Sequence, residues 1–149
     1  MPIDRVLATS EATGALGRWL GRLVLPGDVV LLDGPLGAGK TTLVRSLVEE
    51  LGGDPALVAS PTFTLMNLYA ARLPIAHVDA YRLEIPGQLA ALGFDEIIED
   101  GLGVIEWAER VAAVIPPARA WRITLAHAVA GRTAQIEPPP GRGVPSPPA

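Results

Sequence analysis

The chain has 149 residues, the size of one domain that buries roughly two-thirds of its extended surface. It has no cysteine, which excludes a disulfide framework, and no basic segment followed by an apolar run that would predict a signal peptide or a membrane span. We therefore expect a cytoplasmic protein without a membrane partner. The net charge of −4, from 12 Lys and Arg against 16 Asp and Glu, argues against a large basic face that would bind DNA or RNA autonomously.

The first two predicted helices enclose a short strand. Ser10 is a typical helix cap, and apolar residues between 12 and 23 recur at helical spacing, which predicts a helix with one stripe facing the core. Residues 29–32 are all apolar and predict a strand buried on both faces. Helical spacing of apolar residues returns between 43 and 51. Strand, loop and helix therefore occur in the order that a phosphate-binding loop requires.

The loop between this strand and the second helix matches the pattern G-x-x-x-x-G-K-[ST]. Its residues are Gly34, Pro35, Leu36, Gly37, Ala38, Gly39, Lys40, Thr41 and Thr42. The glycines permit positive φ, so that backbone N–H groups can turn inward and form an anion nest. Lys40, the only lysine of the chain, would neutralise the β- and γ-phosphates, and Thr41 would offer its hydroxyl to Mg²⁺. The sequence therefore predicts a nucleoside triphosphate site, and the absence of a guanine-specific N-K-x-D pattern favours ATP.

Further strands and helices follow the second helix. Residues 62–69 and 75–79 predict two strands, and residues 86–98 predict one or two short helices. Residues 102–107 predict a buried strand, and alternating residues from 121 to 136, with Gly131 between them, predict a closing hairpin.

These elements predict one α/β domain of the P-loop NTPase fold, covering residues 1–137. Its central sheet would be mixed and mainly parallel, with helices on its faces. Residues 138–149 are half proline and almost free of large apolar groups, and this composition predicts a disordered tail.

Two predicted strands end in a carboxylate. Asp79 closes the strand at 75–79 and Glu106 comes at the end of the strand at 102–107. Ligands of open α/β sheets collect at the carboxyl ends of the strands, where the phosphate loop also begins, so both acids are candidates for the Mg²⁺ and catalytic site. The alternative is that each acid caps the helix that follows it.

The segment Ser60–Thr64 follows the second helix as a nucleotide-sensing switch would, and its hydroxyls, among them Thr62 and Thr64, are catalytic candidates. An ordinary entry into a strand explains the same residues equally well. For His77 we favour the interpretation of a hydrogen-bonded histidine within a strand over that of a proton carrier. For Trp107 we favour a packing role over a catalytic role, and we place it among the residues expected to contact the cofactor.

Four blocks of the sequence closely resemble the bacterial TsaE (YjeE) family. They are Leu36-Gly37-Ala38-Gly39-Lys40-Thr41-Thr42, Ser60-Pro61-Thr62-Phe63-Thr64-Leu65, His77-Val78-Asp79-Ala80-Tyr81-Arg82-Leu83 and Val104-Ile105-Glu106-Trp107-Ala108-Glu109-Arg110. The blocks have the family's order and spacing, and the resemblance covers about residues 6–137. Many families share the phosphate loop, whereas the H-x-D-x-Y-R-L and I-E-W blocks are far more specific. One position departs from the family, which usually has aspartate where this chain has Pro35.

The resemblance implies a small Mg²⁺-dependent ATPase that acts with TsaB and TsaD proteins in forming threonylcarbamoyladenosine in tRNA. It would meet tRNA only through that complex, and ATP hydrolysis would reset the transferase between turnovers.

The resemblance also implies a role for each matched residue. Lys40 and Thr42 would contact phosphates, Thr41 and Glu106 would hold Mg²⁺ or its water, and Asp79 would be a metal-site or catalytic carboxylate. Residues near the nucleotide would include three outside the blocks: Thr9, Ser10 and Arg132.

Two other functions share these features. A small-molecule kinase also pairs a phosphate loop with acids, although the arginines here are scattered without an obvious lid insertion. A nucleotide-gated interaction module would bind ATP and hydrolyse it negligibly. An acceptor assay separates the kinase from the ATPase, and addition of the partners and tRNA separates the ATPase from the module.

Overall fold

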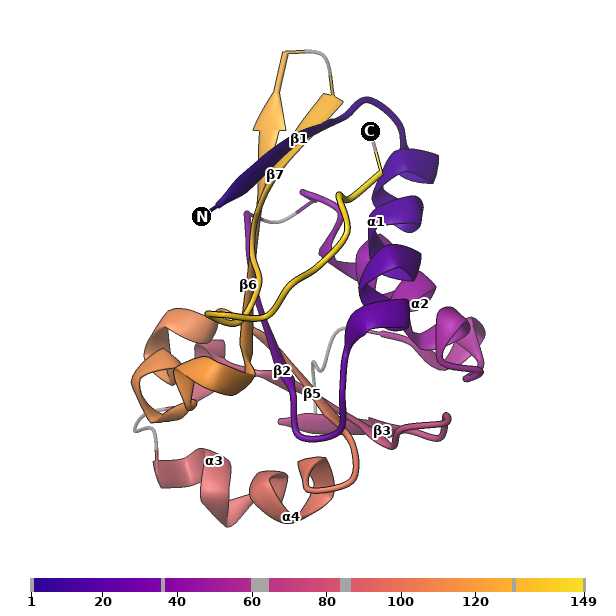
Figure 1. Cartoon of the computed structure of the whole chain (residues 1–149). Helices are drawn as coiled ribbons and strands as arrows, with labels where there is room; N and C mark the ends of the chain where they lie inside the picture. Colours follow the sequence, from indigo (N-terminus) through magenta and orange to yellow (C-terminus); the bar gives the residue numbers. More distant parts are fainter. Residues whose placement is uncertain (1, 36, 60–64, 84–86, 130, 149) are drawn as a thin grey trace.

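The computed structural model describes residues 2–35, 37–59, 65–83, 87–129 and 131–148, and these form a seven-stranded sheet with helices on both faces (Figure 1). The strands are β1 (Ile3–Leu7), β2 (Val29–Asp33), β3 (Met66–Tyr69), β4 (Ile75–Asp79), β5 (Leu102–Glu106), β6 (Ala120–Ala128) and β7 (Gly131–Glu137). Their spatial order is β1-β7-β6-β2-β5-β4-β3.

The centre of the sheet is parallel and its margins are antiparallel. β2 pairs in parallel with β6 on one side and with β5 on the other, and β5 pairs in parallel with β4. β1, β7 and β3 join by antiparallel pairing. The first four residues of β2 and all five of β5 are buried, as expected for strands covered on both faces. The predicted mixed α/β sheet is confirmed.

The α-helices within the described residues are α1 (Ser10–Leu23), α2 (Lys40–Glu50), α3 (Gly87–Ala91) and α4 (Phe94–Ile98). α1 and α2 cover one face of the sheet, and the shorter α3 and α4 lie on the other (Figure 1). The predicted cap of α1 was wrong by one residue. Thr9 is the cap, because its backbone is extended and its hydroxyl accepts a hydrogen bond from Ala12 N (3.1 Å), whereas Ser10 already belongs to the helix.

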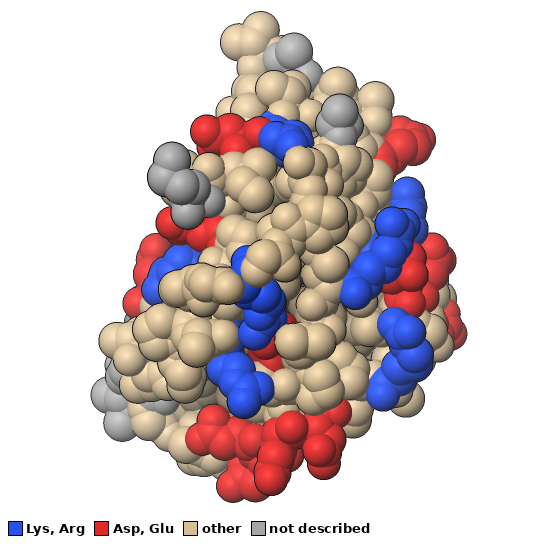
Figure 2. Space-filling model, in the orientation of Figure 1, with Lys and Arg blue, Asp and Glu red and all other residues tan. Residues whose placement is uncertain are grey.

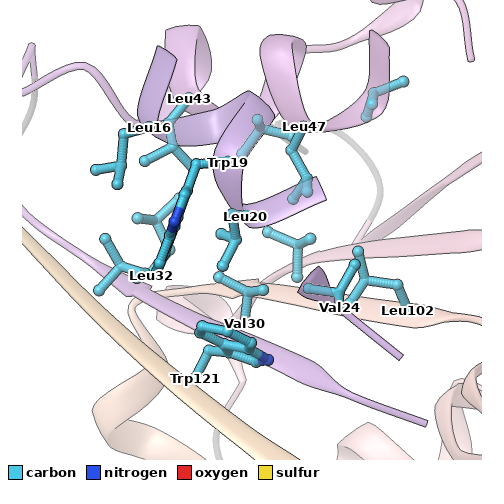
Figure 3. Close-up of a cluster of buried hydrophobic side chains, with 14 of the residues drawn as sticks. Leu16, Trp19, Leu20, Val24, Val30, Leu32, Leu43, Leu47, Leu102 and Trp121 are labelled. Atoms are coloured by element: carbon cyan, nitrogen blue, oxygen red, sulfur yellow. The ribbon is translucent and has the colours of Figure 1, made fainter. Parts of the chain in front are cut away.

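The larger of the two cores lies between the sheet and the pair α1 and α2 (Figure 3). Trp19 from α1 meets Trp121 from β6 edge to face, with ring centroids 5.9 Å apart. Leu43 and Leu47 of α2 are fully buried in the same cluster. The apolar stripes predicted for both helices are therefore the surfaces that fix α2, and with it the end of the phosphate loop, on the sheet.

Glycines allow α1 and α2 to approach closely. A Cβ at Gly17 would lie 2.5 Å from the carbonyl oxygen of Leu43, which belongs to the backbone of the neighbouring helix. Gly17→Ala is therefore expected to lower the free energy of unfolding by about 1–3 kcal/mol, because the helices must separate to admit the methyl group. Urea unfolding of the purified variant measures this change.

Gly14→Ala is the matched control for that prediction. The nearest atom to a Cβ at Gly14 is Ser46 Oγ at 3.0 Å, which belongs to a side chain that can rotate. Alanine also gains roughly 0.5–1 kcal/mol over glycine within a helix. If Gly17→Ala proves as stable as Gly14→Ala, the close approach of the two helix backbones is contradicted.

The proline-rich segment after β7, for which the composition predicts a disordered tail, makes contacts with the domain. Residues 138–148 run back toward the start of α1 (Figure 1), and Val144 packs against the larger core. Arg142 donates to both carboxylate oxygens of Asp28, which is fully buried, and its guanidinium lies over the Trp121 ring. Arg142 thus gives a buried acid its cationic partner. The domain boundary at residue 137 and the disordered tail beyond it stay predictions.

No helix in the part of the chain that the structure describes combines the length and hydropathy needed to cross a bilayer. The face in Figure 2 carries its arginines in separate places, with acidic side chains gathered at its lower end, where Figure 1 places α4. Exposed acids in this region are Asp95, Glu96, Glu99 and Asp100.

Candidate functional site

The phosphate loop connects the carboxyl end of β2 to the start of α2. Gly37 and Gly39 adopt left-handed conformations, with φ of 78° and 104°, as the predicted anion nest requires. Gly39 is the N-cap residue of α2 and offers no side-chain cap, so the first N–H groups of that helix remain directed toward the loop. Leu36 lies outside the described residues. The loop is thus a backbone feature at the positive end of an eleven-residue helix.

Lys40 lies folded over this loop. Its Nζ donates to the carbonyl oxygen of Gly34 (2.7 Å), lies 3.9 Å from Glu106 Oε1 and sits 4.7 Å above the centre of the Trp107 ring. The side chain is only 8% exposed, so its charge is partly removed from solvent and depends on these neighbours. The structure therefore brings Lys40 together with Glu106 and Trp107, which follow it by 66 and 67 residues in the sequence.

Glu106 ends β5 between the ends of β2 and β4. Its register partners are Leu32 and Asp79, so it occupies the central position at the carboxyl edge of the parallel strands. The carboxylate is almost fully buried and uses Oε2 to accept a hydrogen bond from His77 Nε2 (2.6 Å). Oε1 remains turned toward Lys40. Glu106 is thus a buried acid held by a buried histidine at the mouth of the loop.

Asp79 stands beside Glu106 on β4 but is engaged differently. Its Oδ1 accepts from the backbone N–H of Tyr81 (3.0 Å) and so caps the short 3-10 turn at Ala80–Arg82. Capping, the alternative interpretation for both acids, is therefore observed for Asp79, while Glu106 caps nothing in the described structure. Asp79 therefore caps a turn, whereas Glu106 is hydrogen-bonded to a histidine. A metal-binding role for Asp79 stays a prediction.

Trp107 has a left-handed backbone, with φ of 56° and ψ of 46°, and it is the one such non-glycine residue among those described. Asp33, the last residue of β2, accepts from the backbone N–H of Ala108 (3.0 Å) and holds the turn that follows. The indole packs against Tyr81, with ring centroids 5.2 Å apart, and faces Lys40. The role of Asp33 in holding this turn was not predicted from the sequence. Its position directly before Gly34, the first residue of the phosphate loop, was the one signal that could have indicated it.

Arg132 of β7 closes the other side of the loop. Its guanidinium donates twice to the carbonyl oxygen of Gly37, at 3.0 and 3.2 Å. A Cβ at Gly39 would lie 3.4 Å from Thr13 of α1 and 3.5 Å from Arg132, so this part of the loop is enclosed by both elements. Arg132 therefore lies at the loop, while Thr9 and Ser10 lie at the start of α1. The nucleotide contacts of all three residues stay predictions.

His77 has partners on both ring nitrogens. Besides the hydrogen bond from Nε2 to Glu106, its Nδ1 lies 2.8 Å from the hydroxyl of Tyr69. Burial raises the pKa of the Tyr69 hydroxyl above its ordinary value, and the nearby negative charge of Glu106 raises it further, against opposing hydrogen bonds at Ala59 and Asn67. The prediction of a hydrogen-bonded strand histidine is confirmed, and its link to Glu106 was not foreseen.

The phosphate and metal roles predicted for Thr41 and Thr42 stay predictions. Thr41 and Thr42 lie in the first turn of α2, next to Lys40. Thr62 and Thr64, with the rest of Ser60–Thr64, lie outside the described residues, so their switch and catalytic roles stay predictions.

A parallel strand, a glycine loop with left-handed residues and a helix that begins at the loop lysine define the fold of the P-loop NTPase class. The model of one family, described as threonylcarbamoyl adenosine biosynthesis protein TsaE, matches residues 7–134. The chain therefore belongs to the TsaE family.

Individual relatives agree with this assignment. The chain is 45% identical over 122 residues to the tRNA threonylcarbamoyladenosine biosynthesis protein TsaE of Nostoc sp., and the match covers 74% of each chain. It is 38% identical over 112 residues to the protein of the same name from Rickettsia conorii, covering 74% of this chain and 64% of that relative. The chain thus spans less than two-thirds of that relative's length.

A solved structure shares the fold. The crystal structure of YdiB from Bacillus subtilis superposes with a TM-score of 0.68 at 30% sequence identity. The superposition covers 91% of this chain and 83% of the other.

Proposed function

We propose that this protein is a Mg²⁺-dependent ATPase that serves the formation of threonylcarbamoyladenosine in tRNA. The observation that carries the proposal is the meeting of Lys40 and Glu106, 3.9 Å apart, above a glycine loop at the positive end of α2. Membership of the TsaE family supports the pathway. The ATPase activity is inferred from the chemistry of these residues.

The loop fits the triphosphate of ATP in charge and in shape. Backbone N–H groups at Gly37 and Gly39 and at the start of α2 supply donors for phosphate oxygens. Lys40 would exchange its contact with the Gly34 carbonyl for the β- and γ-phosphates. Arg132, already fixed on Gly37, would hold the loop in the shape that the phosphates need.

Magnesium fits the oxygen donors that stand beside Lys40. Thr41 would contribute its hydroxyl and Glu106 its carboxylate, either directly or through water, while Asp79 stands next to Glu106 on the neighbouring strand. When bound, the ion would neutralise charge on the phosphates.

Glu106 is suited to orient the attacking water. His77 occupies Oε2, so Oε1 is left to accept a hydrogen bond from a water in line with the γ-phosphate. Lys40 and the loop amides would stabilise the charge that develops on the phosphoryl oxygens. Trp107 and Tyr81, packed together beside Lys40, would help to keep bulk water from this side of the site.

TsaB- and TsaD-like proteins are the proposed partners, and ATP hydrolysis would reset their complex between turnovers. The net charge of −4 supports indirect contact with tRNA, since a chain that bound RNA alone would carry a basic face. A tRNA-modifying role fits a cytoplasmic protein.

The proposed function is tested by phosphate release from Mg²⁺-ATP, measured for the protein alone and with TsaB, TsaD and tRNA. We expect stimulation by the partners, and we expect Glu106→Gln to reduce turnover about 100-fold through loss of the carboxylate that orients water. Nucleotide affinity, measured by calorimetry, should change far less than turnover, because Lys40 and the loop amides supply the phosphate contacts.

Glu109→Gln is the matched control, since Glu109 is an exposed acid three residues further along. It should keep the turnover of the unaltered protein. A rate of phosphate release that the partners do not change, together with transfer of phosphate to a small acceptor, would favour the kinase. ATP binding without partner-stimulated release would favour the interaction module.

A further inference from the structure

A line of buried hydrogen bonds joins Glu106 to the backbone at Ala59. Glu106 is bonded to His77 (2.6 Å), His77 to Tyr69 (2.8 Å), and the Tyr69 hydroxyl lies 3.1 Å from the carbonyl oxygen of Ala59. Tyr69, His77 and Glu106 come from β3, β4 and β5, three neighbouring strands. Tyr69 is 5% exposed, His77 1% and Glu106 4%, so bulk water does not compete for the two hydrogen bonds that join these three side chains.

The proton positions along this line are largely determined by the chemistry of the groups. When the Glu106 carboxylate is ionised it only accepts, and His77 Nε2 is then the donor to Oε2. In the neutral ring Nδ1 is then an acceptor, and the Tyr69 hydroxyl donates to it. Burial raises the pKa of Tyr69, which keeps this hydroxyl protonated at neutral pH.

Ala59 is held by two side chains of β3. Its carbonyl oxygen accepts from Asn67 Nδ2 (3.1 Å), and its N–H donates to the Tyr69 hydroxyl oxygen (3.4 Å). The single hydroxyl proton of Tyr69 can be donated to the Ala59 carbonyl oxygen (3.1 Å) or to His77 Nδ1, and the contact with His77 is the shorter, at 2.8 Å. Tyr69 can therefore serve Ala59 as an acceptor and His77 as a donor at the same time.

This arrangement leaves Glu106 with one restrained oxygen and one available oxygen. A carboxylate at a strand end can rotate about its side-chain torsions, and rotation would point Oε1 away from the loop. The hydrogen bond from His77 opposes that rotation, and Tyr69 in turn fixes the ring and its tautomer.

We propose that His77 and Tyr69 are positioning residues that hold the Glu106 carboxylate in its working orientation and tie it to the backbone at Ala59. The inference rests on the proposed ATPase function. Both residues act through Glu106, so both should affect turnover while leaving nucleotide affinity nearly unchanged.

Two substitutions at His77 test the hydrogen bonds of its two ring nitrogens separately. Glutamine places an amide near Nε2 and keeps a donor for Glu106, whereas asparagine places an amide near Nδ1 and keeps only the contact with Tyr69. We expect His77→Asn to lower kcat about 10- to 100-fold, the range typical of lost outer-shell partners. His77→Gln should retain at least about one-third of kcat, and in both variants the affinity for Mg²⁺-ADP, measured by calorimetry, should stay within about threefold.

Tyr69→Phe is the second variant, because it removes one hydroxyl and keeps the buried ring. It should lower kcat roughly two- to tenfold, the size expected for loss of one neutral hydrogen bond. Ile75→Val is its control. Ile75 is fully buried and pairs with Tyr69 across the strands, so the change loosens the same core at a cost of about 0.5–1.5 kcal/mol without touching the line of hydrogen bonds.

The results separate this inference from the function on which it rests. If the unaltered protein releases phosphate and Tyr69→Phe and His77→Asn match it, the positioning role is overturned while the ATPase stands. Equal loss in His77→Gln and His77→Asn, or equal loss in Ile75→Val and Tyr69→Phe, would also overturn it, because only general core stability would then matter. If the unaltered protein neither binds Mg²⁺-ADP nor releases phosphate, the ATPase proposal itself fails.

Discussion

Replacement of Lys40 by alanine or methionine is expected to abolish measurable nucleotide binding. Removing one partner of a desolvated charge pair costs about 2–5 kcal/mol, which corresponds to a loss of roughly 30- to 4,000-fold in affinity. Lys40 lies almost buried against Gly34 and Glu106, so its ammonium group is already held at the mouth of the loop. Calorimetric titration with Mg²⁺-ATP and Mg²⁺-ADP measures the effect.

The methionine variant isolates the charge. Methionine keeps an unbranched apolar stem against Trp107, so a binding loss there cannot be ascribed to a cavity. Lys40→Arg should also bind poorly, because a planar guanidinium does not fit the cradle that suits a compact ammonium. Arg22→Ala is the charge-matched control, since Arg22 is exposed on α1 with only a 3.8 Å contact to Glu50.

Affinity of Lys40→Met within about threefold of the unaltered protein would contradict the assignment of the loop as the phosphate site. Loss of folding is a separate outcome that circular dichroism and urea unfolding detect. Binding loss in a fully folded variant is the expected result.

Replacement of Arg142 by methionine is expected to lower the free energy of unfolding by about 3–5 kcal/mol, the usual cost of leaving a buried charge without its partner. Asp28 is fully buried, and Arg142 supplies its cationic partner, although Trp121 Nε1 and Leu25 N also donate to this carboxylate. The composition of residues 138–149 alone would predict no effect. Urea unfolding decides between the two expectations.

Two further variants sharpen this experiment. Arg122→Met is the matched control, because Arg122 is exposed on β6 and the change of charge is the same. Asp28→Asn combined with Arg142→Met should recover much of the stability, since the buried charge disappears with its partner. A change below about 0.5 kcal/mol in Arg142→Met would show that the segment after β7 does not hold the domain, as a disordered tail would not.

Local patterns in the sequence were sufficient to predict the strand and the helix that flank the phosphate loop. The buried strand at 29–32, the complete glycine motif and the helical spacing after Lys40 predicted β2, the loop and α2 in their observed order. Each depends on backbone preferences and on burial patterns that a few neighbouring residues encode. The antiparallel strand β1 was missed, because five residues at an edge form a strand only through pairing with β7.

The residues of the site could likewise be identified in the sequence, but the separate role of each residue could not be predicted from it. A carboxylate at the end of a strand was predicted twice, and the same pattern describes an acid that caps a turn, Asp79, and an acid held by a histidine, Glu106. Which role each acid takes depends on side chains from other strands. A pattern that is read along one strand does not contain that information.

The sequence by itself determined the class of fold, the phosphate loop with its single lysine, and the family to which the chain belongs. The tertiary structure alone decided that Tyr69 and His77 orient Glu106, that Asp33 holds the turn at Trp107, and that Arg142 neutralises Asp28. Loop and strand preferences are local, so they can be predicted from short stretches. A buried polar group must instead be satisfied by whatever the folded chain brings to it, here from 8 to 114 residues away.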